Sequence, residues 1–314
     1  MAQFALLAMS HSPLLGINDP GDEVTASLND AFSHVRSFVN DFDPELIVTI
    51  APDHYNGFFY DLMPPYCIGY EALSVGDYDS IEGPLSVPTE ISEEMAQFVI
   101  DKGIDIAISR RMEIDHGAVQ PIELLYESLT AKPTVPVYVN GVARPFVPME
   151  RVRKMGQAIG EYLAGRDERI LLIASGGLSH DPPVPQWATA TDEQRQLLLN
   201  GRHPTEEARN NRQMNVINTA KAFARGEAEI LDLNPEWDRK FMDDCASNDP
   251  TRFDAYHADD MDEQAGHSSH EVRSWVAAFS ALHSAAGAYS VDFEYYKPIR
   301  EYIAGFGIMI ATPN

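Results

Sequence analysis

The sequence predicts an α/β fold: a largely parallel or mixed central sheet with helices on both faces, and a helical C-terminal portion. Two observations lead to this prediction. Short apolar runs recur along the chain, and their apolar residues are nearly continuous rather than alternating, as in strands that are covered on both faces. Helical apolar spacing separates these runs, and alternation of strand and helix favours a parallel sheet with helices on either side.

Each predicted element follows from its local pattern. We expect strands at the apolar runs 4–9, 46–51, 104–109, 134–140, 170–176 and 303–312. We expect helices at 22–41, 91–103, 149–165 and about 270–285. Asp43 and Pro44 end the first helix, and Gly103 and Gly165 are suitable C-terminal caps for the next two.

The residue composition of the chain changes after about residue 186. Residues 188–250 are polar and charged, with a helical pattern and few strand signals. No linker rich in glycine, serine or proline interrupts the sequence, and no internal repeat is evident. We therefore expect one domain over residues 1–314 with a helical insertion at about 186–285. Two domains that divide near residue 186 are the alternative.

The composition limits the possible partners. The 314 residues carry a formal net charge of −25, and 44% of them are apolar, which is typical of a folded globular protein. The acidic balance argues against nucleic acid and anionic membrane as partners, because both attract basic patches. Its simplest interpretation is solubility, so an anionic substrate would need a local positive charge at its binding site.

Cysteines and targeting signals point to a cytoplasmic protein. Cys67 and Cys245 form no CxxC pair, so no zinc knuckle or redox motif is present. Residues 1–13 lack the basic and long apolar parts of a signal peptide, and no run approaches the ~20 apolar residues that span a bilayer. We expect a cytoplasmic homo-oligomer with no membrane partner.

Four of the ten histidines closely follow an apolar run: His11, His54, His116 and His180. The stretch VTIAPDHYNGFFYD at 48–61 is one example, where a strand ends just before an acid, an imidazole and a cluster of rings. The carboxyl ends of parallel strands lie along one edge of a sheet, where open α/β sheets bind ligands. We therefore expect these four histidines to share one site.

A carboxylate on a later helix could complete a metal site. In GHSSHEVRSWVAAFSAL at 266–282, Glu271 shares a helix face with Trp275 and other apolar residues that should meet the core. A carboxylate there costs free energy unless it is paired or binds a metal. The alternative is an acidic residue that complements the helix dipole. His267 lies on nearly the same face and competes as a ligand, and His270 is a weaker candidate. Two histidines and one carboxylate describe a non-haem Fe(II) oxygenase site.

The motifs as a set are similar to a known family. SHSP at 10–13, APDHYNGFFYD at 51–61, DHG at 115–117, GGLSH at 176–180 and the HEVRSW helix resemble the class III extradiol catechol dioxygenases, whose type is the protocatechuate 4,5-dioxygenase β subunit. SHSP or DHG alone would be weak evidence, whereas PDHYNGFFYD and SGGLSH in this order are specific. The resemblance extends from His11 to PIREYIAGFG at 298–307, nearly the whole chain.

The resemblance implies a reaction and a role for each site residue. It implies Fe(II) bound by His11, His54 and Glu271, with His116 as the acid and His180 as the base. It implies extradiol cleavage of a catechol with O2, both oxygen atoms entering the product. The chain looks most like members that open 3-(2,3-dihydroxyphenyl)propionate and 2,3-dihydroxycinnamate to a 2-hydroxy-6-oxonona-dienedioate in aromatic (phenylpropanoid) catabolism.

Substrate contacts and alternatives stay open at the level of sequence. Tyr55, Phe58 and Phe59 could wall the substrate ring, although such rings more often serve packing. A cation should meet the propionate, and the candidates close to motif strands are Arg110, Arg111, Arg144 and Lys297. The ligand types alone do not separate Fe from Zn, so a zinc-dependent hydrolase is one alternative. A dioxygenase for a different catechol is another.

Overall fold

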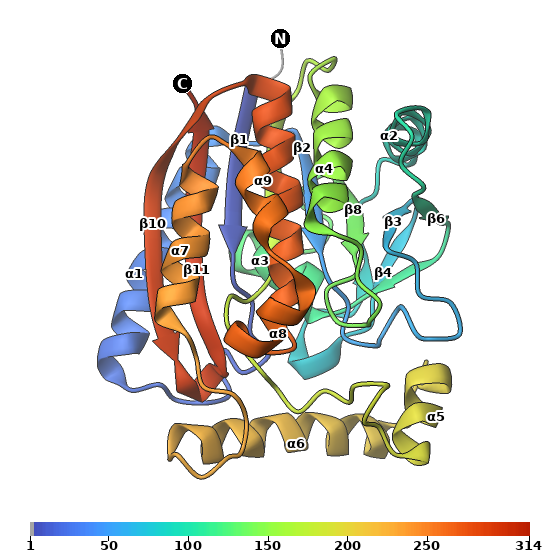
Figure 1. Cartoon of the computed structure of the whole chain (residues 1–314). Coiled ribbons are helices and arrows are strands. Elements are labelled where there is room, and N and C mark those ends of the chain that lie inside the picture. The colour runs from blue at the N-terminus through green and yellow to red at the C-terminus, as the bar shows by residue number, and fades with distance from the viewer. Residues whose placement is uncertain (1–2) are drawn as a thin grey trace.

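The computed structural model describes residues 3–314 and has the predicted α/β architecture (Figure 1). Met1 and Ala2, which belong to the segment assessed above for a signal peptide, lie outside the described residues. An eight-stranded sheet has the strand order β10-β11-β1-β9-β2-β8-β3-β6. Its centre is four parallel strands: β1 (Gln3–Met9), β9 (Arg169–Ser175), β2 (Leu46–Ala51) and β8 (Thr134–Val139). The prediction of a largely parallel or mixed central sheet is confirmed, and the sheet is mixed with a parallel centre.

Antiparallel pairs extend this parallel centre on both sides. On one side β11 (Ala304–Pro313) pairs with β1, and β10 (Tyr289–Ile299) pairs with β11. On the other side β3 (Tyr66–Gly69) runs antiparallel to β8, and β6 (Ala107–Ser109) is parallel to β3. A separate small sheet contains β5 (Gly83–Pro84), β4 (Ala72–Ser74) and β7 (Met112–Ile114).

Helices cover both faces of the main sheet. Alternate residues of β1 show this, since Leu6 packs into one core and Leu7 into the other, and both are fully buried. Burial of one such side chain stabilises the fold by about 1.5–3 kcal/mol. The core around Leu6 includes residues of α2 (Thr89–Asp101), α4 (Met149–Leu163), α7 (Pro235–Ala246) and α9 (Arg273–Ala286). The core around Leu7 includes residues of α1 (Asp22–Phe42), α3 (His116–Tyr126) and α6 (Glu206–Ala224).

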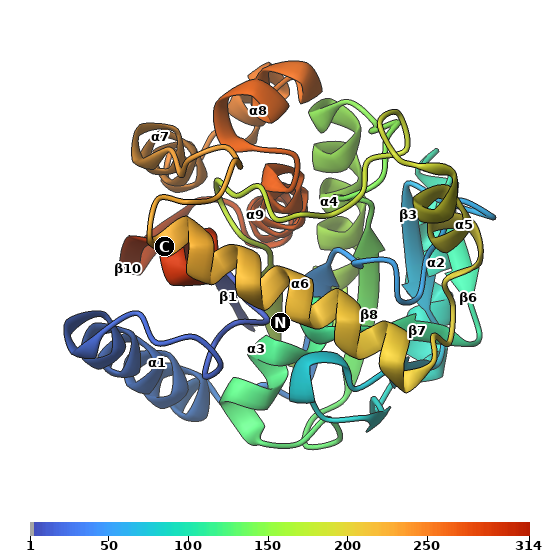
Figure 2. The same ribbon diagram turned by 90° about the horizontal axis from the view of Figure 1, so that it is seen from below.

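The chain between β9 and α9 is mainly helical. It contains α5 (Asp192–Asn200), α6, α7 and α8 (Ala258–Ala265), with no strand between Ser175 and Tyr289 in this part of the structure. Helix α6 runs across the C-terminal ends of the central strands rather than along a face of the sheet (Figures 1 and 2). Its C-terminal half buries Ile217, Ala220 and Phe223, whereas its N-terminal half buries no residue.

The predicted strand at 104–109 is shorter than expected. Only residues 107–109 form β6, and the chain then enters β7 in the small sheet.

No helix in the described part of the chain is long and apolar enough to cross a membrane. Cys67 and Cys245 are both buried and unpaired. That residues 1–314 form one domain with a helical insertion stays a prediction. The positions of the helices and strands do not establish which part of the chain folds as one cooperative unit.

Candidate active site

Three of the predicted histidines converge because their strands are neighbours. His11 follows β1, His54 follows β2 and His180 follows β9, and β9 lies between β1 and β2 in the parallel centre of the sheet. The loops at these strand ends therefore meet at one edge, as the sequence predicted.

His116 reaches the same place by a different route. It is the first residue of α3 and follows β7, which belongs to the small sheet, so the expectation that all four histidines sit at the edge of one sheet is wrong for His116. The preceding Asp115 is the N-cap of α3 and accepts a hydrogen bond from the backbone N–H of Gly117 at 3.0 Å. The capped first turn of α3, and not the end of a strand of the main sheet, therefore positions His116.

Glu271 lies among these histidines. It comes from a 3₁₀ turn, Ser269–Val272, directly before α9, whereas the sequence predicted an α-helix there. Its Oε1 atom is 2.9 Å from His54 Nε2, and its Oε2 atom is 3.4 Å from His11 Nε2. The backbone N–H of Gly177 donates to Oε2 at 2.8 Å. The carboxylate is thus held in place from the sheet side and faces two imidazoles.

The ring orientation of His11 and His54 is fixed by their Nδ1 atoms. His11 Nδ1 is hydrogen-bonded to the Ser175 hydroxyl at 3.0 Å, and His54 Nδ1 donates to Asp115 Oδ2 at 3.1 Å. Both Nε2 atoms therefore face Glu271, 3.5 Å from each other. Metal-ligating histidines have this arrangement, with one nitrogen engaged by a carboxylate, carbonyl or other polar group and the other directed at the ion.

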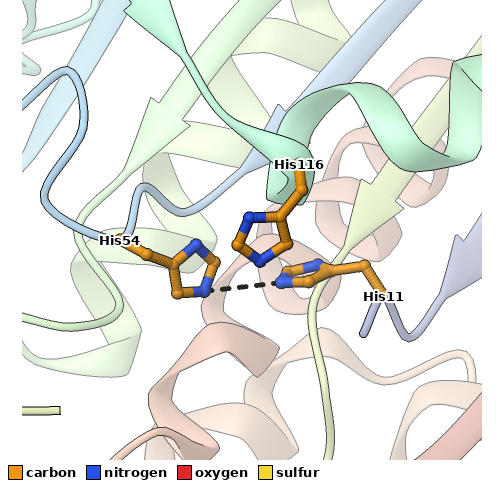
Figure 3. Close-up of side chains that lie close together, drawn as sticks. All are labelled: His11, His54 and His116. Atoms are coloured by element: carbon orange, nitrogen blue, oxygen red, sulfur yellow. Dashed lines mark hydrogen bonds between the residues drawn. The ribbon is translucent and has the colours of Figure 1, made fainter. Parts of the chain in front are cut away.

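The spacing of these atoms fits a metal ion. Ligand atoms that share an ion at about 2.0–2.2 Å lie roughly 3–3.5 Å apart, and the three separations here run from 2.9 to 3.5 Å. Figure 3 shows that His11, His54 and His116 also face one another, and their ligand atoms lie within 4.8 Å. His116 is therefore a competing ligand, but Glu271 is closer and supplies the negative charge that a divalent cation requires.

Burial and neighbouring charges perturb these groups strongly. Burial lowers the pKa of His11 to about 3, against the opposing effect of the Glu271 carboxylate. Burial acts in the same direction on His54, but Asp115 and Glu271 outweigh it and raise the pKa of His54 well above its usual value. The nearby imidazoles of His180 and His11 hold the pKa of Glu271 well below its usual range, although burial opposes this.

The other two histidines are oriented in the same way. His116 Nδ1 donates to Asp77 Oδ2 at 2.6 Å, and His180 Nδ1 donates to the Leu178 carbonyl at 2.8 Å. His180 Nε2 then lies 3.0 Å from Glu271 Oε1. His116 Nε2 is buried and has no hydrogen-bond partner in the part of the chain that the structure describes. His116 thus presents an unpartnered Nε2 beside the point where the ligand atoms of His11, His54 and Glu271 meet, whereas the Nε2 of His180 contacts the Glu271 carboxylate.

Two glycines of the sequence motifs allow this close packing. A Cβ atom on Gly176, in SGGLSH, would lie 2.5 Å from the carbonyl oxygen of Glu271. A Cβ atom on Gly117, in DHG, would lie 3.0 Å from His54 Cε1 and 3.3 Å from His11 Cε1. Larger residues would displace the carboxylate or the imidazoles. Glycine at these two positions therefore lets the backbone lie close to Glu271 and to the rings of His54 and His11.

A cavity of about 510 Å³ opens from these residues toward α6. Its volume is in the range of sites for small organic ligands. The wall is largely apolar and includes Leu14, Pro182, Val184, Leu198 and Ile303. All four histidines and Glu271 contribute to its lining. The arrangement therefore combines a metal-binding group, two further imidazoles and room for a small aromatic molecule.

Comparison with known proteins identifies the family. Residues 5–307 match the family described as the catalytic LigB subunit of aromatic ring-opening dioxygenase. The chain belongs to the LigB family. LigB-family dioxygenases are metal-dependent oxidoreductases, in agreement with the histidine and carboxylate groups that could hold an ion here.

Curated relatives of this LigB-family dioxygenase match over nearly their full length. The chain is 60% identical over 307 residues, 98% of each chain, to the 2,3-dihydroxyphenylpropionate/2,3-dihydroxicinnamic acid 1,2-dioxygenase of Rhodococcus globerulus. Proteins of the same name match at 60% in Rhodococcus rhodochrous, over 98% of this chain and 97% of the relative, and at 46% in Xanthobacter autotrophicus, over 98% and 99%. A solved uncharacterized protein from Escherichia coli K12 is 14% identical over 99% of both chains, with a TM-score of 0.49.

The LigB-family site includes some predicted residues and leaves out others. His267 is largely exposed and its Nδ1 bonds to Asp181 at 2.8 Å, so Glu271 and not His267 meets the histidines. Of the three predicted ring walls, Tyr55 lines the cavity. Phe58 stacks on Tyr138 with 3.9 Å between ring centroids, and Phe59 is buried in a separate apolar cluster. Neither phenylalanine belongs to the cavity lining, because both serve packing beneath the loop.

The structure also corrects the cation candidates in this dioxygenase. None of the four predicted residues lines the cavity: Arg110, Arg111, Arg144 and Lys297. Arg144, for example, pairs with Asp259 at 2.9 Å and also with Asp262. The lining instead contains Arg212 of α6, which sequence reasoning missed. No local sequence pattern marks Arg212 as a site residue. It lies in a polar helical segment far from the motifs, and the sequence of such a segment looks like that of a helix exposed to solvent.

Proposed function

We propose that the chain is an extradiol dioxygenase that uses Fe(II) and O2 to open 3-(2,3-dihydroxyphenyl)propionate, and also 2,3-dihydroxycinnamate, in aromatic catabolism. The observation that carries the proposal is the meeting of the Glu271 carboxylate with His11 Nε2 and His54 Nε2 at the end of the cavity. The names of the curated relatives, up to 60% identical, support the substrate.

His11, His54 and Glu271 would hold the ion. Two histidines and one carboxylate with open positions are the ligand set of non-haem Fe(II) oxygenases. When bound, the ion would supply Lewis acidity toward the catechol hydroxyls and open positions for ligands. Ser175 and Asp115 would keep the two imidazoles in the orientation that binding requires.

His180 would act as the general base. Its Nδ1–H donates to the Leu178 carbonyl, so Nε2 is the atom that would accept a proton from a catechol hydroxyl. Burial alone would lower the pKa of His180, but the adjacent Glu271 carboxylate reverses this and raises it. A base that is tuned by its surroundings and lies 3.0 Å from a ligand carboxylate is suited to this proton transfer.

His116 would act as the general acid. The Asp77 carboxylate accepts a hydrogen bond from its Nδ1, so its Nε2 would be the atom that donates a proton into the cavity. During ring opening this Nε2–H would donate a proton to the opening product, a 2-hydroxy-6-oxonona-dienedioate. The absence of any other partner for His116 Nε2 among residues 3–314 supports a role that requires it to be free.

The sequence left two alternative functions open, a zinc-dependent hydrolase and a dioxygenase for a different catechol, and the family comparison supports them unequally. Membership of the LigB family removes the support for a zinc-dependent hydrolase, because the family opens aromatic rings. A different catechol as the preferred substrate is an outcome of the test below. We also propose a cytoplasmic homo-oligomer and a single domain over residues 1–314, which cell fractionation, light scattering and the cooperativity of unfolding would test.

The test is anaerobic reconstitution of the purified protein with Fe(II) or Zn(II), followed by oxygen and a panel of catechols. We expect oxygen uptake, a yellow product and incorporation of both atoms of ¹⁸O2 with Fe(II) and the propionate-bearing catechol. Activity with an unsubstituted catechol in preference to the propionate would change the substrate. Failure to open any catechol with Fe(II) would overturn the proposal.

A further inference from the structure

We infer that Arg212 on α6 is the carboxylate-binding residue of the cavity and selects catechols with an anionic side chain. This inference rests on the proposed function and extends it, because it names the group that recognises the substrate's side chain. Arg212 contributes to the lining of the same cavity as the four histidines and Glu271.

One face of α6 is directed into the cavity. The lining residues from this helix are Ala208, Asn211, Arg212, Asn215 and Val216. Their spacing of three and four residues places them on a single side of the helix. An arginine and two asparagine amides occupy the middle of this side, where a helix that only packed against a core would carry apolar residues. The cavity therefore has hydrogen-bond donors on the wall formed by α6.

The contacts of Arg212 leave its charge without a counterion. Its guanidinium donates to the Tyr55 carbonyl at 3.2 Å and to Asn56 Oδ1 at 2.6 Å, which are both neutral acceptors. No carboxylate of residues 3–314 lies within 4.0 Å of it. A guanidinium has five N–H donors, so several are still available to a bound anion.

Arg212 is connected to the metal-binding end by a short chain of hydrogen bonds. Asn56, which accepts from Arg212, donates to Asp115 Oδ2 at 2.9 Å. Asp115 Oδ2 in turn accepts from His54 Nδ1. The guanidinium is thus held close to the loop that carries His54, within the same cavity. A substrate that bound at His54 and Glu271 would direct a short side chain along this wall.

The charges around the cavity make a positive group necessary for an anionic substrate. The carboxylates in its lining are Asp77 and Glu271, and the whole chain has a net charge of −25. Among the residues that the structure describes, Arg212 is the only arginine or lysine in the lining. A carboxylate on a two-carbon chain would gain a charge-assisted hydrogen bond from Arg212 and would otherwise enter a negative field.

A structural role for Arg212 makes a different prediction. Its two hydrogen bonds could only fasten α6 to the loop after β2, in which case its removal would affect every catechol equally. Arg209 is a matched control for this possibility. It lies one turn earlier on α6, donates to the Val75 carbonyl at 3.1 Å and does not line the cavity.

The experiment compares Arg212→Gln, Arg212→Lys and Arg209→Gln with the parent on two catechols, 3-(2,3-dihydroxyphenyl)propionate and the uncharged 3-propylcatechol. We expect Arg212→Gln to lower kcat/KM for the propionate roughly 10- to 100-fold, mainly through KM, and to change the propyl substrate little. Arg212→Lys should recover part of the loss, and Arg209→Gln should leave the ratio of the two substrates unchanged. Equal losses on both substrates, or no loss on either, would overturn the inference.

A binding measurement separates this inference from the proposed function. 3-Phenylpropionate has the carboxylate but no hydroxyls, so its affinity for the metal-free protein can be measured by calorimetry without turnover. Weaker binding by Arg212→Gln than by the parent supports the carboxylate site even if no catechol is opened. Unchanged binding, or a parent protein that does not bind 3-phenylpropionate, counts against Arg212 even if the parent opens catechols.

Discussion

The Nδ1 atom of His116 lies 2.6 Å from Oδ2 of Asp77, whereas Nε2 of the same ring is buried and unpartnered among residues 3–314. Asp77 also accepts the backbone N–H of His116 at 2.8 Å and is itself fully buried. One carboxylate therefore fixes both the ring and the helix start that bears it. Asp77 acts through His116, so it is a positioning residue for the proposed acid.

Asp77→Asn should slow ring opening while iron binding is nearly unchanged. The amide keeps the size of the side chain but removes the charged acceptor that orients the His116 ring, so kcat should fall while KM stays close to that of the parent. Asp79→Asn is the control, because Asp79 belongs to the same 3₁₀ turn and is exposed. An unchanged kcat in iron-loaded Asp77→Asn would show that this carboxylate only supports the fold.

The assignment of metal ligands predicts which substitutions release iron. His11→Ala and His54→Ala should abolish iron binding in a folded protein, as measured by metal content and circular dichroism. Glu271→Gln should weaken affinity by more than the roughly 10–100-fold seen for loss of an outer partner. His267→Ala should have little effect, since His267 is exposed and pairs with Asp181. Full iron occupancy in the first two variants would exclude this ligand set.

Metal binding near pH 7 should release about one proton, because ligands must be deprotonated. The pKa of His54 lies well above its usual value, so without metal His54 is protonated at pH 7, and its Nε2–H can donate to Glu271. The ion needs that lone pair and displaces the proton. The pKa of His11, at about 3, means that His11 has no proton to lose. Calorimetry in two buffers of different ionisation enthalpy measures the release, and identical heats would contradict it.

The buried centre of the fold could be predicted from sequence because burial on both faces leaves a continuous apolar run. The runs at 4–9, 46–51 and 134–140 correspond to β1, β2 and β8 within one residue at each end. Strand β10 was missed for the opposite reason. It is a partly exposed edge strand in which Val291, Phe293 and Tyr295 alternate with charged or polar residues, a period-two signal that a search for continuous runs does not detect.

The site could be predicted where chemistry and strand ends coincide, as for His11, His54 and His180. Helix α3 was not predicted, and Pro121, which lies inside it, is a residue that usually marks the end of a helix. Arg212 was missed because its proximity to His54 depends on how α6 crosses the strand ends, which no local pattern encodes. Residues brought to a site by tertiary packing alone are therefore beyond sequence reasoning of this kind.

The two proposed acid–base histidines should be separable by the step that each one affects. His180→Gln removes the acceptor for a catechol proton, so anaerobic formation of the catecholate, followed by its absorbance, should be slow. His116→Gln should form the catecholate normally and then stall before the yellow product appears. Each loss of general acid–base catalysis should reduce turnover by about 10²–10⁴-fold.

Iron content and catechol affinity should stay close to the parent in both variants, because neither ring is an assigned ligand. This expectation is tested more strictly at His116 than at His180. The potential ligand atom of His116 lies within 4.8 Å of those of His11 and His54, so His116 could itself bind the ion. If His116→Gln loses iron and Glu271→Gln keeps it, then His116 is a ligand and cannot also be the acid. If an iron-loaded His116→Gln or His180→Gln protein turns over near the parent rate, that histidine is structural and its proposed role is withdrawn.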